Sequence, residues 1–114
     1  GFITMNVPKL LDVLEQQGID NPIVCANINK IGFRMCGGIA LYEETIKNRR
    51  FRPVAMSVLA SGALSPREAI DYVCKQRIES IVFGASSRGN IRQTVKLIEE
   101  HWGPNKVKAD ALPA

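Results

Sequence analysis

The feature that most constrains this chain is a pattern that occurs four times along 114 residues. A short apolar run is followed each time by a longer segment whose apolar residues recur at helical spacing. The apolar runs occupy residues 1–6, 22–27, 53–60 and 80–84, and the helical segments occupy residues 7–17, 39–48, 65–74 and 90–102. The length suits one domain, so we predict a domain over residues 1–103 and a C-terminal tail over residues 104–114.

The clearest helix start in the sequence is the segment Ser65-Pro66-Arg67-Glu68. Serine before the helix, proline at its first position and glutamate at its third predict a capping box. The first helix has a similar start, because Pro8 fits a first turn, and Gly18 fits the C-terminal cap.

Strands that alternate with helices predict a parallel sheet with right-handed crossovers. Runs that are apolar on both faces predict a sheet that is covered on both sides. A doubly wound nucleotide-binding sheet would carry a glycine-rich loop after its first strand, but the segment there is Asn6-Val7-Pro8. We therefore predict the α/β fold class, with a parallel (β/α)4 architecture that forms half of a TIM barrel.

Two stretches of the chain resemble the C-terminal part of the aldo-keto reductase barrel. They are Ser57-Val58-Leu59-Ala60-Ser61-Gly62 and Phe83-Gly84-Ala85-Ser86-Ser87-Arg88-Gly89-Asn90-Ile91. Residues 1–17 are also similar to the fifth strand and helix of that family. The resemblance departs at Val58, where the family often has proline.

The resemblance implies the C-terminal half of an oxidoreductase barrel that uses NADP(H). The family's catalytic residues come from the first half of the barrel, which has no counterpart here. A chain of 114 residues is also about half of a ~250-residue barrel. We therefore expect a piece or a stand-alone half that is not catalytic by itself. The alternatives are a barrel aldolase or lyase that acts on a phosphorylated substrate, and a non-catalytic (β/α)4 scaffold that self-associates.

Ligands of parallel α/β folds bind outside the carboxyl ends of the strands. The last loop joins a strand to a helix N-terminus, where small residues, hydroxyls and an arginine favour a phosphate. The predicted phosphate or cofactor site there consists of Gly84, Ala85, Ser86, Ser87, Arg88 and Asn90. Ser57, Ser61 and Gly62 are predicted to form the opposite wall of the same pocket. The alternative is a plain turn in which serine caps the helix.

Three asparagines follow the first two strands and are candidates for the rest of the pocket: Asn6, Asn27 and Asn29. Strand alternation would direct Asn27 and Asn29 to the same side, toward the mouth of a barrel. Lys30 is a candidate Schiff-base lysine on the condition that it is buried and desolvated. The alternative is that these residues satisfy the backbone of their loop.

Several classes of site are excluded by the composition. Three cysteines, Cys25, Cys36 and Cys74, are an odd number without a C-x-x-C pair, which argues against a disulfide framework and a zinc site. With a single histidine, we expect no metal. The net charge of +4 is mild, and its basic cluster at residues 47–52 fits a helix C-terminus better than a nucleic-acid site. No apolar run approaches the ~20 residues that span a bilayer, and we expect a cytoplasmic protein.

Four strands do not close into a barrel, so two edges and one apolar face would stay open to water. We therefore predict a homo-oligomer, or association with a missing N-terminal half-barrel. A phosphorylated small molecule is the expected ligand.

Overall fold

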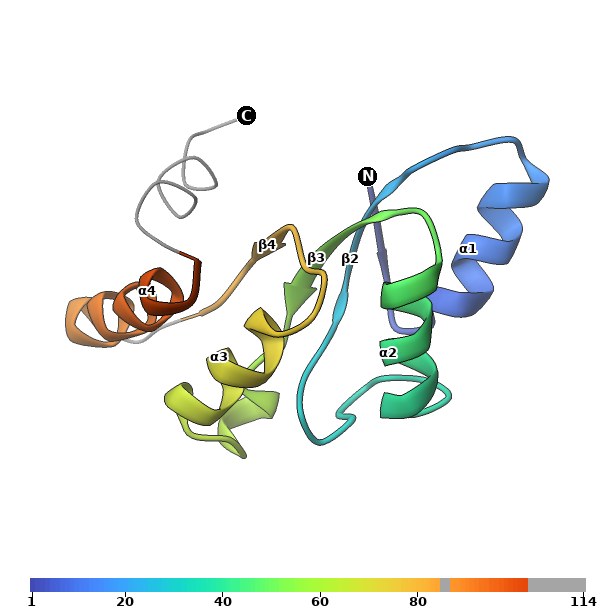
Figure 1. The fold of residues 1–114 in the computed structure, drawn as a ribbon. Coiled ribbons are helices and arrows are strands. Elements are labelled where there is room, and N and C mark those ends of the chain that lie inside the picture. Colours follow the sequence, from blue (N-terminus) through green and yellow to red (C-terminus); the bar gives the residue numbers. More distant parts are fainter. Residues whose placement is uncertain (85–86, 103–114) are drawn as a thin grey trace.

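The computed structural model describes residues 1–84 and 87–102, which form a parallel sheet of four strands alternating with four α-helices (Figure 1). The strands are β1 (Phe2–Thr4), β2 (Ile23–Asn27), β3 (Arg52–Met56) and β4 (Ser80–Ile81). The helices are α1 (Val7–Gln16), α2 (Ile39–Asn48), α3 (Pro66–Cys74) and α4 (Arg88–Trp102), with a 3-10 turn, η1 (Ala60–Gly62), before α3. The predicted α/β class is confirmed. The predicted tail lies outside the described residues.

The strands lie in the sheet in the order in which they occur along the chain, β1-β2-β3-β4. All three pairings are parallel; Phe2 is opposite Val24, Val24 opposite Pro53, and Val54 opposite Ser80. A doubly wound sheet reverses its strand order at a switch point, and this sheet has no such reversal among the described strands. Sequential order with crossovers of one hand brings every helix to the same face.

Burial confirms that the helices cover one face of the sheet. Val24, Ala26 and Ala55 have no exposed surface, and they share one face because their positions alternate along paired strands. The helices contribute buried side chains to the same core: Leu11, Ile46, Ile70, Val73, Leu97 and Ile98. Each buried aliphatic side chain contributes about 1.5–3 kcal/mol to folding, so this layer accounts for most of the stability.

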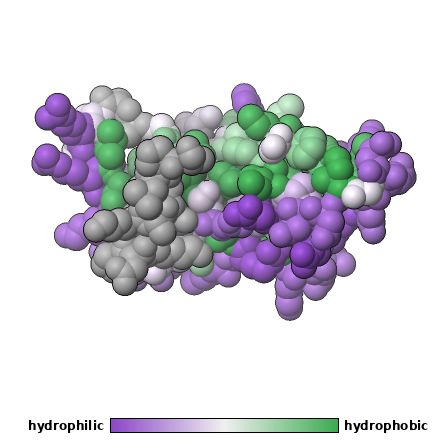
Figure 2. All heavy atoms as spheres, turned by 90° about the horizontal axis from the view of Figure 1, so that it is seen from above, coloured by the Kyte–Doolittle hydropathy of each residue, from purple (hydrophilic) through white to green (hydrophobic). Residues whose placement is uncertain are grey.

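The opposite face of the sheet, called the open face below, is not covered by any described helix. Its members lie at the alternate strand positions: Ile3, Ile23, Cys25, Asn27, Arg52, Val54, Met56, Ser80 and Val82. Ile3 is 77% exposed and Val82 54% exposed, although both are strongly apolar. In Figure 2 hydrophobic side chains gather along one long side of the molecule and hydrophilic ones along the other. Within the described residues, helices cover only one face of the sheet.

The third strand is shorter than the sequence predicts. Residues 53–60 were expected as one strand because they are almost entirely apolar, but β3 ends at Met56. Ser57, Ala60 and Ser61 have φ angles of 55°, 51° and 55°, in the left-handed region that interrupts a strand. The apolar character of this segment therefore does not predict its backbone conformation. β1 and β4 are also shorter than predicted.

The predicted helix starts are present. Ser65 Oγ accepts a hydrogen bond from Glu68 N at 3.4 Å, with Pro66 at the first helical position. The Glu68 carboxylate pairs with Lys30 Nζ at 2.7 Å, so the glutamate half of the capping box is used for a tertiary contact. In α1, Asn6 Oδ1 accepts from Lys9 N at 3.3 Å, and Pro8 lies in the first turn.

Candidate functional site

A groove of about 580 Å³ lies between the carboxyl ends of β3 and β4. It is lined by residues 56–59, 61–62 and 82–84. The groove therefore brings together four residues that the sequence predicted for one site: Ser57, Ser61, Gly62 and Gly84. The parallel strand order causes this, because loops that follow neighbouring parallel strands emerge at the same edge.

One wall of the groove, formed by residues 57–62 and called the first wall below, has a strained backbone. Three residues that carry side chains, Ser57, Ala60 and Ser61, adopt left-handed φ angles within five positions. Each such residue costs about 1–2 kcal/mol, and strain of this kind collects at ligand-binding sites. The turn is held by hydrogen bonds from Ala60 N to Ser57 O at 3.0 Å and from Gly62 N to Leu59 O at 3.0 Å. No pattern in the sequence predicts this strain, since serine and alanine rarely adopt such angles.

The hydroxyl groups of the first wall are available to a ligand. Neither Ser57 Oγ nor Ser61 Oγ is hydrogen-bonded to another residue in the part of the chain that the structure describes. Ser61 is exposed and Ser57 half-buried. A hydroxyl provides one donor and two acceptor positions, so both groups suit phosphate oxygens.

Three more residues predicted for this site, Ser87, Arg88 and Asn90, lie at the start of α4 and are not among the residues that line the groove. Ser87 Oγ accepts from Asn90 N at 3.2 Å, and Ser87 O accepts from Ile91 N at 3.1 Å. Ser87 thus caps the helix, as in the plain-turn alternative, but its O–H remains able to donate. Arg88, in the first turn, is exposed. Ala85 and Ser86, also predicted for this site, lie outside the described residues.

Asn29 is buried behind the groove and contacts the backbone of Ser57, one of its lining residues. Its side chain is fully buried; Nδ2 donates to Phe33 O at 2.9 Å and Ser57 O at 3.3 Å, and Oδ1 accepts from Phe33 N at 2.8 Å. The residue ties the β2–α2 loop to the strained end of β3. This is the backbone-satisfying role that was the alternative to ligand binding, and it also fixes Ser57.

The other predicted pocket residues are not among those that line the groove. Asn6 is half-buried and caps α1. Asn27 is 3% exposed and belongs to the open face. Lys30 is 48% exposed in its side chain and paired with Glu68, so it lacks the desolvation that a Schiff-base lysine needs.

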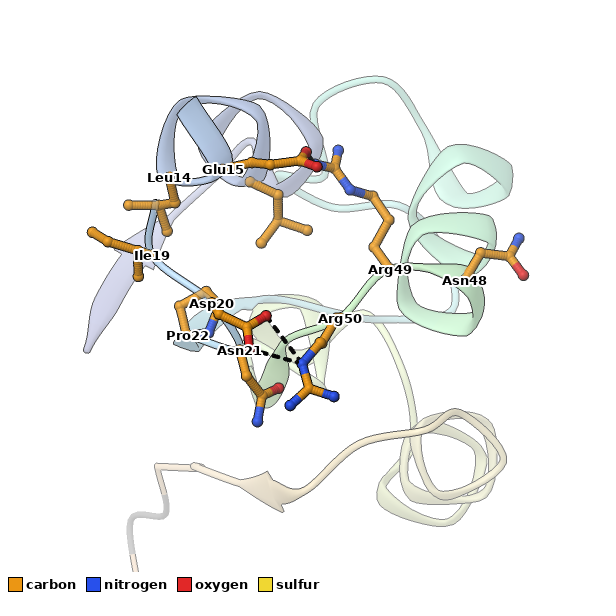
Figure 3. A pocket seen from close by; sticks show the side chains of 10 residues that line it. Leu14, Glu15, Ile19, Asp20, Asn21, Pro22, Asn48, Arg49 and Arg50 are labelled. Atoms are coloured by element: carbon orange, nitrogen blue, oxygen red, sulfur yellow. Dashed lines mark hydrogen bonds and ion pairs between the residues drawn. The ribbon is translucent and has the colours of Figure 1, made fainter. Parts of the chain in front are cut away.

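A smaller cavity of about 280 Å³ lies at the amino ends of the strands, between α1 and the turns at residues 19–22 and 48–50 (Figure 3). In Figure 3 the Arg50 guanidinium meets the Asp20 carboxylate beside this cavity, at 3.0 Å. Arg49 pairs with Asp12 at 2.7 Å and with Glu15 at 3.3 Å. Three cations of the basic cluster, Arg49, Arg50 and Arg52, are therefore matched by carboxylates, and we do not assign a ligand to this end.

The described residues that line the groove include no ionisable side chain. The shifted pKa values belong to residues elsewhere: burial raises the pKa of Cys25 on the open face, and burial with a hydrogen bond to Glu43 raises that of Tyr72 on α3. General acid–base chemistry needs a titratable group within reach of the reacting atom. The groove is thus equipped to bind rather than to transfer protons.

Two further properties of the described residues concern metals and membranes. Residues 1–84 and 87–102 contain no group of three or more histidine, cysteine, aspartate or glutamate side chains placed to hold a metal ion. Within the same residues, every helix is too short or too polar to cross a bilayer.

In comparisons with known proteins, no family model, curated protein or solved structure matches this chain.

Proposed function

We propose that this chain is the C-terminal half of a TIM-barrel enzyme, similar to the aldo-keto reductases, and contributes a phosphate-binding or NADP(H)-binding site. The observation that carries the proposal is the groove at the carboxyl ends of β3 and β4, lined by Ser57, Ser61, Gly62 and Gly84. In TIM barrels the loops after the last two strands often bind a phosphate. Sequential parallel strands with one face covered by helices are also the arrangement that a half-barrel requires.

The binding chemistry follows from the groove and from the start of α4. Backbone N–H groups at the start of α4, together with the positive end of its dipole, favour an anion. The hydroxyls of Ser57 and Ser61 supply donors from the groove, and Arg88 supplies a guanidinium that binds phosphate oxygens in pairs. The parent barrel is then an oxidoreductase, and this half supplies binding energy while the acid–base groups belong to the other half.

The aldolase or lyase alternative receives no support from the position of Lys30. That lysine is half-exposed and ion-paired, whereas an amine nucleophile needs a lowered pKa through desolvation. The scaffold alternative shares the open face with the present proposal, and it differs in predicting no ligand.

The test is titration calorimetry of the full chain with NADP(H), a sugar phosphate and inorganic phosphate. We expect Arg88→Ala to weaken binding by about tenfold, since a charge-assisted hydrogen bond contributes about 1.5–3 kcal/mol. The matched control is Arg92→Ala, because Arg92 is exposed one turn further along the same helix. Absence of binding for all three ligands, or equal losses in both variants, would remove the proposed site.

A further inference from the structure

The open face has the composition of an interior rather than a surface. Ile3, Ile23 and Val82 are 77%, 43% and 54% exposed, and Met5 beside them is 54% exposed. Val54 and Met56 are half-buried in the same layer. Soluble monomers rarely expose a continuous apolar patch of this kind without a partner.

The two edges of the sheet are also unpaired. Within the described sheet β1 contacts only β2, and β4 contacts only β3, so the outer sides of β1 and β4 have no strand neighbour. An exposed edge is a template for another strand. A partner that covered the open face with a helix would leave both edges unsatisfied.

We propose that a second copy of this chain covers the open face, with its β1 beside the first copy's β4 and its β4 beside the first copy's β1. The inference rests on the half-barrel architecture of the proposed function, and the second copy takes the position that the N-terminal half holds in a complete barrel. A two-fold axis parallel to the strands produces this arrangement, and all eight strands are then parallel. One rotation satisfies both edges and the apolar face together, which is why the same chain is the partner that fits.

Charge favours self-pairing. The one ionised side chain on the open face is Arg52, at its amino end, and its Nε donates to the Glu79 carboxylate at 2.9 Å. The remaining positions are apolar or neutral. Two copies therefore meet without the repulsion between like charges that opposes wrong partners.

The area is sufficient for a specific contact. Four large apolar side chains exposed by about half or more correspond to a patch on the order of 500 Å² per copy. Two such patches, extended by the two edge pairings, reach the ~1,000 Å² that specific interfaces need.

The experiment is sedimentation velocity of the full chain without ligand over a range of protein concentrations. The wild-type chain is expected to be a dimer. Ile3→Lys combined with Val82→Lys is expected to weaken association by at least about 100-fold, since it buries unpaired charge at the interface. Ile91→Lys is the control, because Ile91 is 46% exposed on α4 and adds the same charge away from the open face.

A well-folded wild-type monomer, an indefinite aggregate, or a dimer that survives the double substitution would overturn the inference. Circular dichroism checks that the variants fold. If the double variant does not fold, hydrogen exchange of the β1 and β4 amides in the wild-type chain replaces it as the test. Dimer formation should slow exchange in both strands as the protein concentration rises. A dimer that binds no phosphate leaves this inference standing and removes only the proposed function. A monomer that binds phosphate removes this inference and leaves the proposed function standing.

Discussion

Arg77 holds together the junction between α2 and β3, and no pattern in the sequence predicts this role. Its guanidinium donates to Ile46 O at 2.9 Å, Arg49 O at 2.9 Å and Phe51 O at 3.2 Å. It also lies 5.7 Å from the centre of the Phe51 ring. The residue caps the C-terminus of α2 and holds the turn that leads into β3.

We expect Arg77→Ala to lower the free energy of unfolding by about 2 kcal/mol, because three carbonyls lose a charged donor. Arg77→Lys should recover only a part, since an ammonium does not reproduce the planar fork. Urea denaturation measures both. The control is Arg67→Ala, whose exposed 3.5 Å ion pair with Glu100 should contribute less than about 1 kcal/mol. Equal losses at positions 67 and 77 would contradict this role for Arg77.

The residue scale is also where sequence reasoning was least complete. It placed Ser57, Ser61, Gly62 and Gly84 in one site, and they do line one groove. It grouped Asn29 with Asn27 at a barrel mouth, whereas Asn29 is occupied by backbone contacts to Phe33 and Ser57. Such roles depend on contacts that only the folded chain brings together, so the sequence alone does not predict them.

At the scale of elements, local chemistry predicted helix starts better than strand ends. Ser65 and Asn6 were identifiable as caps because capping involves neighbours within three positions. The end of β3 was not identifiable, because the left-handed angles at Ser57 and Ser61 are imposed by the packing of the loop. Helix boundaries are therefore local properties here, while strand lengths depend on the neighbouring strand.

Ser65→Ala is expected to destabilise the chain by about 1 kcal/mol, because the N–H of Glu68 loses its acceptor at the start of α3. Thermal unfolding followed by circular dichroism measures the change. Ser65→Asp is the matched control, since its carboxylate keeps the acceptor and favours the helix dipole. A similar loss in both variants would show that the hydroxyl acts by some means other than capping.

At the scale of the whole molecule, the described helices cover one face of the sheet and leave the other face exposed. Three helix-facing residues of β2 and β3, Val24, Ala26 and Ala55, are completely buried, whereas Ile3 on the open face is 77% exposed. Along β2 and β3 the burial follows the strand period, apart from Asn27, which is buried at the end of β2. This asymmetry is the physical basis for the proposed second copy.

Thiol labelling gives a test at this scale. Cys25 lies on the open face and is half-buried, while Cys36 is exposed. Burial raises the pKa of Cys25 above its ordinary value, so at about pH 8 less of it is in the reactive thiolate form. We expect iodoacetamide to modify Cys36 before Cys25, as followed by mass spectrometry.

The difference between the two cysteines should grow with protein concentration, because a second copy would cover Cys25. The chain unfolded in urea is the control, in which both thiols should react at similar rates. A Cys25 rate that does not depend on concentration, in a folded chain, would speak against cover over this part of the open face.

The sequence by itself determined the four strand–helix units, their parallel class and the helix caps, because these follow from apolar periodicity and from contacts within a few residues. The tertiary structure decided that the strands run in sequential order, that the loops after β3 and β4 share a groove, and that none of the described helices lies over one apolar face. Strand order and the cover of a face are long-range packing outcomes. Apolar runs record only that a segment will be buried, and they carry no information about which surface buries it.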